Sequence, residues 1–191
     1  MSPASMMTVV ASEPMLQRRA DARLRGMVEA HIDAMARLLR RLGVPESDVD
    51  DAVQQVFLTA ARRLGDIEPH AEKSFLYKTA LHVAAHARRT VARRRESGDD
   101  GAPEQADGRP SAEELIDRRR AAALLEEVLE LMPEELRTVF VLFEIEQLPT
   151  LEIAALLEVP VGTAASRLRR AREEFQERVA RLRARRTRGA P

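Results

Sequence analysis

The sequence predicts an all-α protein of two small helical domains joined by a flexible acidic linker. Apolar residues recur at helical spacing along most of the 191 residues. Hydrophobic residues make up 45% of the chain but aromatic residues only 3%, so the core must be built from Leu, Val and Ala, which suit helices. Between Glu96 and Pro110 no apolar residue is larger than alanine, so this stretch cannot pack. We therefore expect a disordered tail at 1–15, helical domains at 16–95 and 112–185, a linker at 96–111 and a tail at 186–191.

Composition excludes several classes of protein. There is no cysteine, hence no disulfide framework and no thiolate chemistry. No apolar run approaches the length of a membrane span, and the first residues do not resemble a signal peptide, so we expect a cytoplasmic protein without membrane insertion. Lys and Arg (31) balance Asp and Glu (31), which alone argues against a nucleic-acid binder. Their distribution argues the other way, because basic residues gather at 88–95 and 167–188 and acidic residues at 96–107.

The first domain begins with two helices. The first has one buried stripe and ends before Gly43, a typical C-cap; its apolar positions are Leu24, Val28, Ile32, Met35, Leu38, Leu39 and Leu42. The second opens at 45–48 and buries Val49, Val53, Val56, Ala60 and Leu64. Its other face groups Leu58 with Asp51, Gln54 and Gln55. A single exposed leucine needs no explanation, but beside three hydrogen-bonding neighbours it also suggests a partner-docking face.

The third helix begins near Lys73 and is amphipathic. Its inner positions are Leu76, Ala80, Val83 and Ala87, and its basic stripe is Lys78, His82, His86, Arg89 and Arg93. Such a stripe can follow a phosphate backbone. Phe75 and Tyr77 are either core residues or surfaces on which bases stack. His82 and His86 have the i, i+4 spacing of zinc ligands, but no third ligand accompanies them, so we expect no metal site.

The second domain ends in a helix-turn-helix pattern. A capping box at 111–114 opens a helix with apolar positions Leu115, Leu124, Val128 and Leu131. Pro133 starts the next helix, which buries Leu136, Val139, Phe140 and Phe143. Thr150 is the expected N-cap of a short helix that buries Ile153, Leu156 and Leu157 and ends before Pro160. A further helix follows from Val161, and two helices joined by so short a turn favour a helix-turn-helix.

The helix from Val161 has two faces. Ala164, Leu168, Ala171 and Phe175 share the inward face, and the opposite face carries Thr163, Ser166, Arg167 and Arg170, flanked by Arg169 and Arg172. Arginine pairs bidentately with guanine, and serine or threonine meets a base or a phosphate, so this face suits a major groove. The plain alternative is a solvated basic helix; the short helix and turn before it favour DNA binding.

Two stretches carry a resemblance to a known family. Residues 48–58 (DVDDAVQQVFL) and residues 161–172 (VGTAASRLRRAR), the latter preceded by Glu152-Ile-Ala, resemble the core-binding and promoter-reading motifs of σ70-type RNA polymerase sigma factors of the extracytoplasmic-function (ECF) group. The resemblance covers roughly 28–95 and 112–181. It departs from the usual family pattern at five positions, namely Phe75, His82, His86, Pro149 and Ala165.

The resemblance implies a subunit that directs transcription initiation, without cofactor or bond chemistry, and that is controlled by an anti-sigma factor. The docking face would bind the β′ coiled coil of core RNA polymerase through Asp48, Asp51, Gln54, Gln55 and Leu58. The third helix would engage and melt the promoter −10 element through Phe75, Tyr77, Lys78, His82, His86 and Arg89. The last helix would bind the −35 element through Thr163, Ser166, Arg167, Arg169 and Arg170. The acidic linker would pass through the polymerase cleft.

Two alternatives from other classes remain at this stage. An ordinary helix-turn-helix regulator would dimerise and bind DNA without polymerase. A helical enzyme would have to use His82 and His86, but the sequence offers it no nucleophile, metal cluster or paired carboxylates.

Overall fold

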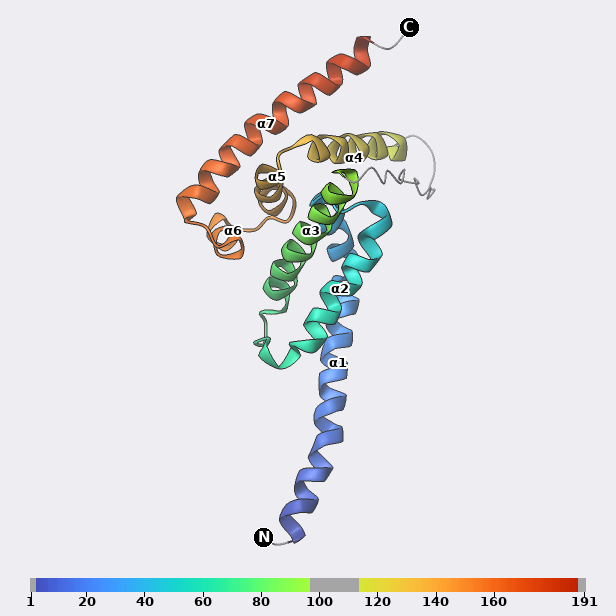
Figure 1. Cartoon of the computed structure of the whole chain (residues 1–191), viewed down its shortest axis with the longest axis vertical. Helices are drawn as coiled ribbons and strands as arrows, with labels where there is room; N and C mark the ends of the chain where they lie inside the picture. The colour runs from blue at the N-terminus through green and yellow to red at the C-terminus, as the bar shows by residue number, and fades with distance from the viewer. Residues whose placement is uncertain (1–2, 97–113, 189–191) are drawn as a thin grey trace.

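The computed structural model describes residues 3–96 and 114–188. Within these ranges the chain is helical and contains no strand, as the sequence predicts. The N-terminal part comprises α1 (Pro3–Arg41), α2 (Val49–Arg62) and α3 (Glu72–Glu96), and the C-terminal part comprises α4 (Glu114–Leu131), α5 (Glu134–Phe140), α6 (Thr150–Leu157) and α7 (Val161–Arg188). Figure 1 shows these two groups of helices side by side. None of the helices in the described ranges is both long and apolar enough to span a membrane.

The N-terminal domain is a three-helix core in which α1, α2 and α3 all contact one another. Its centre is apolar and fully buried, with Leu38 and Leu39 from α1, Val56 from α2 and Leu76 from α3. The first helix ends as predicted: Gly43 has a φ of 87°, and Val44 donates from its amide to the carbonyl of Leu39 at 3.1 Å. This left-handed cap reverses the chain toward α2, so that α2 packs back along α1.

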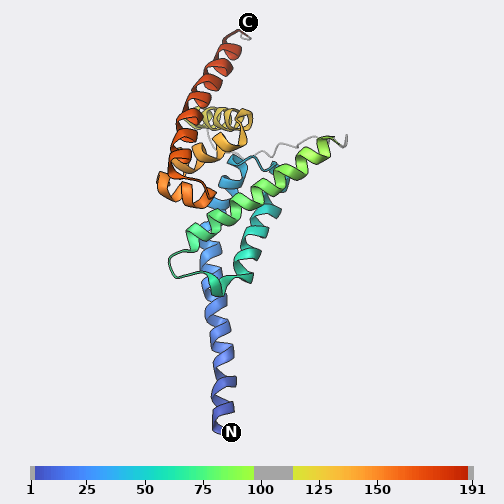
Figure 2. The ribbon, with the colours of Figure 1, turned by 60° about the vertical axis from the view of Figure 1, so that its left-hand side comes forward.

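The first helix is longer than the sequence indicated. The structure begins α1 at Pro3, where we expected a disordered tail up to residue 15. In Figures 1 and 2 the N-terminal half of α1 extends away from the other helices. Pro3 suits the first helical position. Pro14 lies inside the same helix, where it lacks the N–H of a backbone hydrogen bond, so local propensity alone does not account for the added length.

The C-terminal domain packs α7 across α4, α5 and α6. The aromatic rings of Phe140 and Phe175 are stacked, with centroids 4.5 Å apart and planes at 19°. Between α5 and α6 the chain forms a π-helical turn, η3 (Val141–Ile145), and then a bend in which Gln147 has a φ of 57°. The inward residues of α7 are those predicted, because Ala164 and Ala171 are fully buried and Leu168 is nearly so.

One local prediction in the C-terminal domain was wrong. Thr150 is not a cap: the N-cap residue of α6 is Pro149, and no side chain caps this helix. Leu131, one of the apolar positions of α4, is 47% exposed, whereas Leu129 and Met132 are buried. The last helix, α7, reaches Arg188, and we expected a tail from residue 186. Residues 111–113 of the predicted capping box (111–114) and residues 97–111 of the predicted linker lie outside the described residues.

The two domains touch. α3 lies against α6, and α1 lies against α4. Figure 2 shows α6 and the start of α7 next to α3. The buried apolar residues of both domains form one continuous cluster. This contact brings two of the predicted site surfaces close to each other.

Candidate nucleic-acid and partner interfaces

The helix-turn-helix is formed by α6, a tight turn and α7. Glu158 ends α6 with a φ of 55°, a left-handed conformation more usual for glycine or asparagine. Val159 then donates from its amide to the carbonyl of Ala154 at 3.0 Å, and Thr163 donates to the carbonyl of Pro160 at 2.9 Å. The turn therefore stops one helix and starts the next within three residues, and leaves the first turns of α7 open to solvent.

The predicted DNA-binding face of α7 is only partly free. Ser166, Arg169 and Arg170 are exposed, whereas Thr163 is half-buried. The side chain of Arg167 is 25% exposed and pairs with Glu135 of α5 at 2.9 Å. Arg169 pairs with Glu173 at 3.0 Å along the same helix. Arg170 lies on the exposed face and, among the residues described, takes part in no ion pair.

The flanking Arg172 is also engaged within the domain. Its guanidinium lies 2.6 Å from Glu144 and 5.1 Å from the centre of the Phe143 ring. Both contacts join α7 to the π-helical turn. They fix the orientation of α7 on the domain, so Arg172 acts in packing as well as carrying charge.

The basic stripe on α3 faces solvent as predicted. Lys78, His82, His86 and Arg89 are exposed, and Phe75 is half-buried with the guanidinium of Arg63 at 5.8 Å from its ring centre. Lys78 pairs with Glu158 of the other domain at 2.8 Å. The hydrogen bond from Lys78 lowers the pKa of Glu158, which favours the charged carboxylate. The described residues contain no group of three or more His, Cys, Asp or Glu that could hold a metal.

Tyr77 does not lie where a base could stack on it. Its side chain is buried, and its hydroxyl donates to Glu146 at 2.5 Å. Arg41 lies 3.4 Å from the same carboxylate. Burial, followed by the hydrogen bond to Glu146, raises the pKa of the Tyr77 phenol. Sequence reasoning missed Glu146 altogether, because it lies in the other domain.

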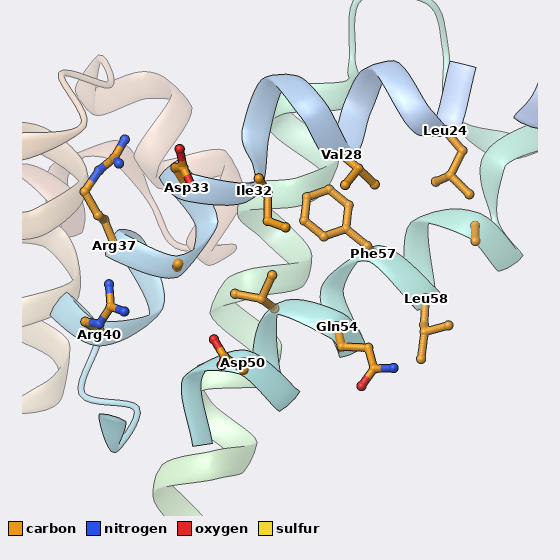
Figure 3. A pocket seen from close by; sticks show the side chains of 13 residues that line it. Leu24, Val28, Ile32, Asp33, Arg37, Arg40, Asp50, Gln54, Phe57 and Leu58 are labelled. Carbon is orange, nitrogen blue, oxygen red and sulfur yellow. The ribbon is translucent and has the colours of Figure 1, made fainter. Parts of the chain in front are cut away.

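A groove lies between α1 and α2 on the outer side of the N-terminal domain. It has a volume of about 720 Å³, and 13 residues line it. Figure 3 shows Phe57 at its floor, with Val28 and Ile32 on one side and Leu58 on the other. The charged residues Asp33, Arg37, Arg40 and Asp50 lie at one end. The groove is therefore apolar along its length and charged at one end.

The structure changes the assignment of several groove residues. Leu24 and Val28 are half-buried and Ile32 is 42% exposed, although all three were predicted to be core. Met27, on the same stretch of α1, is only 4% exposed, so this part of the helix is packed; the three residues instead line the groove beside α2. The predicted docking residues Asp51, Gln54, Gln55 and Leu58 are exposed, and Gln54 and Leu58 line the groove. The fifth, Asp48, is half-buried at the start of α2 and accepts a hydrogen bond from Ser47 at 2.9 Å.

Comparison with known proteins assigns both domains. The family model described as Sigma-70 region 2 matches residues 27–95, and the model described as Sigma-70, region 4 matches residues 122–175. The ECF RNA polymerase sigma-E factor of Escherichia coli K12 is 32% identical over 145 residues, which cover 71% of this chain and 76% of that protein. The ECF RNA polymerase sigma factor SigE of Mycolicibacterium smegmatis is 29% identical over 158 residues, which cover 81% of this chain and 60% of that protein.

Two solved structures have the same arrangement of helices. CnrH, in complex with the cytosolic domain of CnrY, superposes with a TM-score of 0.62 at 25% identity and covers 89% of this chain and 96% of CnrH. The sigma factor RpoE of Bartonella quintana, in complex with the anti-sigma factor NepR, superposes with a TM-score of 0.65 at 18% identity and covers 82% and 96%. Motifs, domain order, helical fold and sequence identity agree, and the chain belongs to the ECF group of RNA polymerase sigma factors.

Proposed function

We propose that this protein directs promoter-specific transcription by binding core RNA polymerase through the groove between α1 and α2 and promoter DNA through α3 and α7. The observation that carries the proposal is the separation of these surfaces. An apolar groove and two basic helix faces belong to one chain and lie on different elements. Such a chain can hold a protein partner and DNA at the same time, as a family of transcription initiation factors requires.

The groove suits a helical protein partner. Its floor is apolar, so an amphipathic helix from the β′ coiled coil would bury its apolar face there. Gln54, at the rim, offers hydrogen bonds, and Leu58 is 42% exposed. Exposed apolar surface next to amide groups is typical of a docking site. We assign Asp48, Asp51 and Gln55 to the same interface as flanking polar contacts.

The −35 element is the proposed ligand of α7. Arg170 and Ser166 are exposed on the face that the turn leaves open, and Arg169 lies beside them. Arg167 and Thr163 are less accessible, so we assign Arg170 the leading role in base contact and the others supporting roles. Alanine at position 165, on the exposed side of α7, contributes no charge.

The −10 element is the proposed ligand of α3. The exposed residues Lys78, His82, His86 and Arg89 supply positive or hydrogen-bonding groups along one side of the helix. Phe75, which is half-buried, would provide a stacking surface for an unpaired base, and Tyr77 could do so only after its contact with Glu146 opens. Opening a base pair costs a few kcal/mol. We expect the contacts between α3 and DNA to offset this cost only together with contacts that polymerase makes to the promoter.

We further propose that the protein acts by binding and carries out no bond chemistry, and that an anti-sigma factor controls it. Histidines 82 and 86, the residues a helical enzyme would need, are exposed and lack a third ligand among the described residues. Support for anti-sigma control comes from the relative RpoE, whose structure was solved with the anti-sigma factor NepR. The proposed domains are 16–95 and 112–185, on either side of the linker.

Run-off transcription with purified core polymerase on a promoter library tests the function. Transcripts that appear only with the protein, and disappear with the double variant Gln54→Ala/Leu58→Arg, are the expected result. Met15→Arg is the matched control, because Met15 is 61% exposed on α1 outside the groove. Circular dichroism would verify that both variants fold. Polymerase-independent binding of a palindromic site, without transcripts, would overturn the proposal in favour of an ordinary regulator.

A further inference from the structure

The contact between the two domains includes polar side chains that reach across it, beside the apolar cluster that the domains share. The hydroxyl of Tyr77 on α3 donates to Glu146, which follows η3, at 2.5 Å. Arg41 at the end of α1 lies 3.4 Å from the other oxygen of this carboxylate, whose side chain is only 14% exposed. Lys78 and Glu158 form a second, exposed pair at 2.8 Å. Each pair joins one residue of the N-terminal domain to one of the C-terminal domain.

A second part of the domain contact contains two arginines, Arg88 and Arg137, that each leave one buried N–H without a hydrogen-bond partner in the part of the chain that the structure describes. Arg88 of α3 donates to the carbonyl of Leu42 and pairs with Glu134 of α5. Arg137 of α5 lies over Gly43 and donates to the carbonyl of Met132 at 3.2 Å. The Nε atoms of Arg88 and Arg137 are both buried without a hydrogen-bond partner among the described residues.

The two arginines also repel each other. Burial, followed by the charge of Arg88, lowers the pKa of Arg137. Two guanidinium groups with buried, unpaired N–H donors are a costly arrangement. The contact therefore combines one favourable, largely buried hydrogen-bond network with a repulsive pair. The unpaired Nε atoms and the repulsion between Arg88 and Arg137 therefore oppose the favourable contacts between the domains.

We propose that the hydrogen-bond network of Tyr77, Glu146 and Arg41 is an autoinhibitory latch that holds the two domains closed over part of α3. In this closed arrangement Tyr77 is buried and cannot meet a nucleic acid, and Lys78, although exposed, is paired with Glu158. Opening the contact frees both. That the covered residues are promoter-binding ones rests on the proposed function; the latch itself rests on the contacts alone.

Distance measurement between the domains tests the latch directly. The chain has no cysteine, so Arg62→Cys on α2 and Gln176→Cys on α7, both exposed, place one label in each domain of the full-length protein. Glu146→Ala is expected to raise the ratio of open to closed molecules about tenfold, the effect of losing about one charge-assisted hydrogen bond. Glu146→Gln, which still accepts from Tyr77, is expected to have a smaller effect. An unchanged distance distribution in Glu146→Ala would overturn the proposal.

The matched control is Glu177→Ala. Glu177 also pairs with an arginine, Arg181 at 3.0 Å, but within α7 and without contact to the other domain. This variant is expected to leave the distance distribution as in the unchanged chain. If it opened the domains as much as Glu146→Ala does, the effect would reflect general charge and not the latch.

Tyr77 provides a second readout, because the chain has one tyrosine and no tryptophan. Ultraviolet absorbance on alkaline titration therefore follows this phenol alone. Arg37, Lys73 and the pair formed by Glu146 and Arg41 supply the charges that face it. We expect the Tyr77 pKa to lie above its ordinary value in the unchanged chain and to fall toward about 10 in Glu146→Ala. The same high value in both proteins would contradict the latch.

Transcription with limiting core polymerase separates the latch from the proposed function. Glu146→Ala is expected to give several-fold more transcript than the unchanged chain, and Glu177→Ala the same amount as the unchanged chain. If the domains of Glu146→Ala separate in the distance measurement but the amount of transcript does not increase, the contact is not autoinhibitory. If neither the unchanged chain nor Glu146→Ala supported transcription, the proposed function would be wrong. The distance distribution and the Tyr77 pKa would still decide whether the latch exists.

Discussion

Arg167 of α7 lies 2.9 Å from the carboxylate of Glu135, so one cation of the helix proposed to bind DNA is held by its own domain. The arginine side chain is 25% exposed and the glutamate 69%. An exposed pair of this kind contributes only about 0–1 kcal/mol. Glu135 therefore competes weakly with DNA for this guanidinium, and the sequence pattern on α7 does not show this competition.

Removal of that competitor should strengthen promoter binding. We expect Glu135→Ala to increase the affinity of the polymerase complex for promoter DNA by up to about fivefold, since release of an exposed ion pair is worth about 1 kcal/mol or less. Electrophoretic mobility shift at fixed salt measures this. Glu177→Ala, which breaks a pair within the distal part of α7, is the control. Weaker binding by Glu135→Ala would mean that Glu135 orients Arg167 for DNA instead of withholding it.

Arg170 should be the strongest single contributor to −35 recognition. Its side chain is exposed on the open face of α7, and a bidentate contact with a base discriminates by about 1–3 kcal/mol. We expect Arg170→Ala to lower −35-dependent transcription about tenfold or more and to relax specificity at one position. Arg185→Ala, also exposed but distal on α7, should have little effect. An equal loss on all promoter sequences would indicate a phosphate contact instead.

The stacked rings of Phe140 and Phe175 should dominate the stability of the C-terminal domain. The centroids are 4.5 Å apart, and Phe140 is 7% exposed. We expect Phe140→Ala to lower the free energy of unfolding by about 3–5 kcal/mol, through lost burial and the cavity it leaves. Urea denaturation followed by circular dichroism measures it. Leu151→Ala is the control: Leu151 is 68% exposed, and its loss should change stability by about 0.5 kcal/mol or less.

Two glycines on α1 and its cap should respond oppositely to alanine. Gly43 has a φ of 87°, and a Cβ there would lie 2.0 Å from Nη1 of Arg137. Left-handed strain alone predicts that Gly43→Ala lowers the free energy of unfolding by about 1–2 kcal/mol. Gly26 lies within α1, where an added Cβ would meet no atom within 4 Å, and Gly26→Ala should raise stability by about 0.5–1 kcal/mol. Thermal unfolding measures both variants: the midpoint temperature should fall for Gly43→Ala and rise for Gly26→Ala, and a change in the same direction for both would contradict the prediction.

The Arg23–Glu72 pair should make stability depend on acid pH. The two side chains lie 2.7 Å apart, and Arg23 also donates to the carbonyl of Ile67 at 2.7 Å, so the pair joins α1 to the loop before α3. The hydrogen bond from Arg23 lowers the pKa of Glu72 below its ordinary value. A lowered folded-state pKa stabilises the fold above the unfolded-state value, and this contribution is lost as the pH falls through the folded-state value.

Urea midpoints across pH measure that contribution. We expect Glu72→Gln to be less stable than the unchanged chain at pH 7. The difference should shrink as the pH falls below about 4.3, the ordinary value for glutamate. Glu68→Gln is the control, since Arg23 contacts only the backbone carbonyl of Glu68. A difference that stays constant from pH 7 to acid would show that the Glu72 charge is not the cause.

Most of the fold could be predicted because helical periodicity is a local property. The spacing of Ala164, Leu168 and Ala171 identified the buried side of α7, and the cap at Gly43 followed from residue type alone. Prediction failed where a side chain's burial depends on which neighbour covers it. Ile32 continues the stripe of α1 and faces α2, but it is covered only in part, so it is 42% exposed and lines the groove instead of the core.

The sequence by itself determined the helices, their faces and the family motifs on α2 and α7, because each is encoded within a few turns of one helix. Only the tertiary structure showed that Tyr77 is buried and bonded to Glu146, which is 69 residues away in the sequence. It also decided that Arg167 is paired and that a groove runs along α1 and α2. Each of these features is a contact between helices that are distant in sequence. The geometry of such a contact depends on how the whole chain packs, and a local sequence pattern carries no information about that.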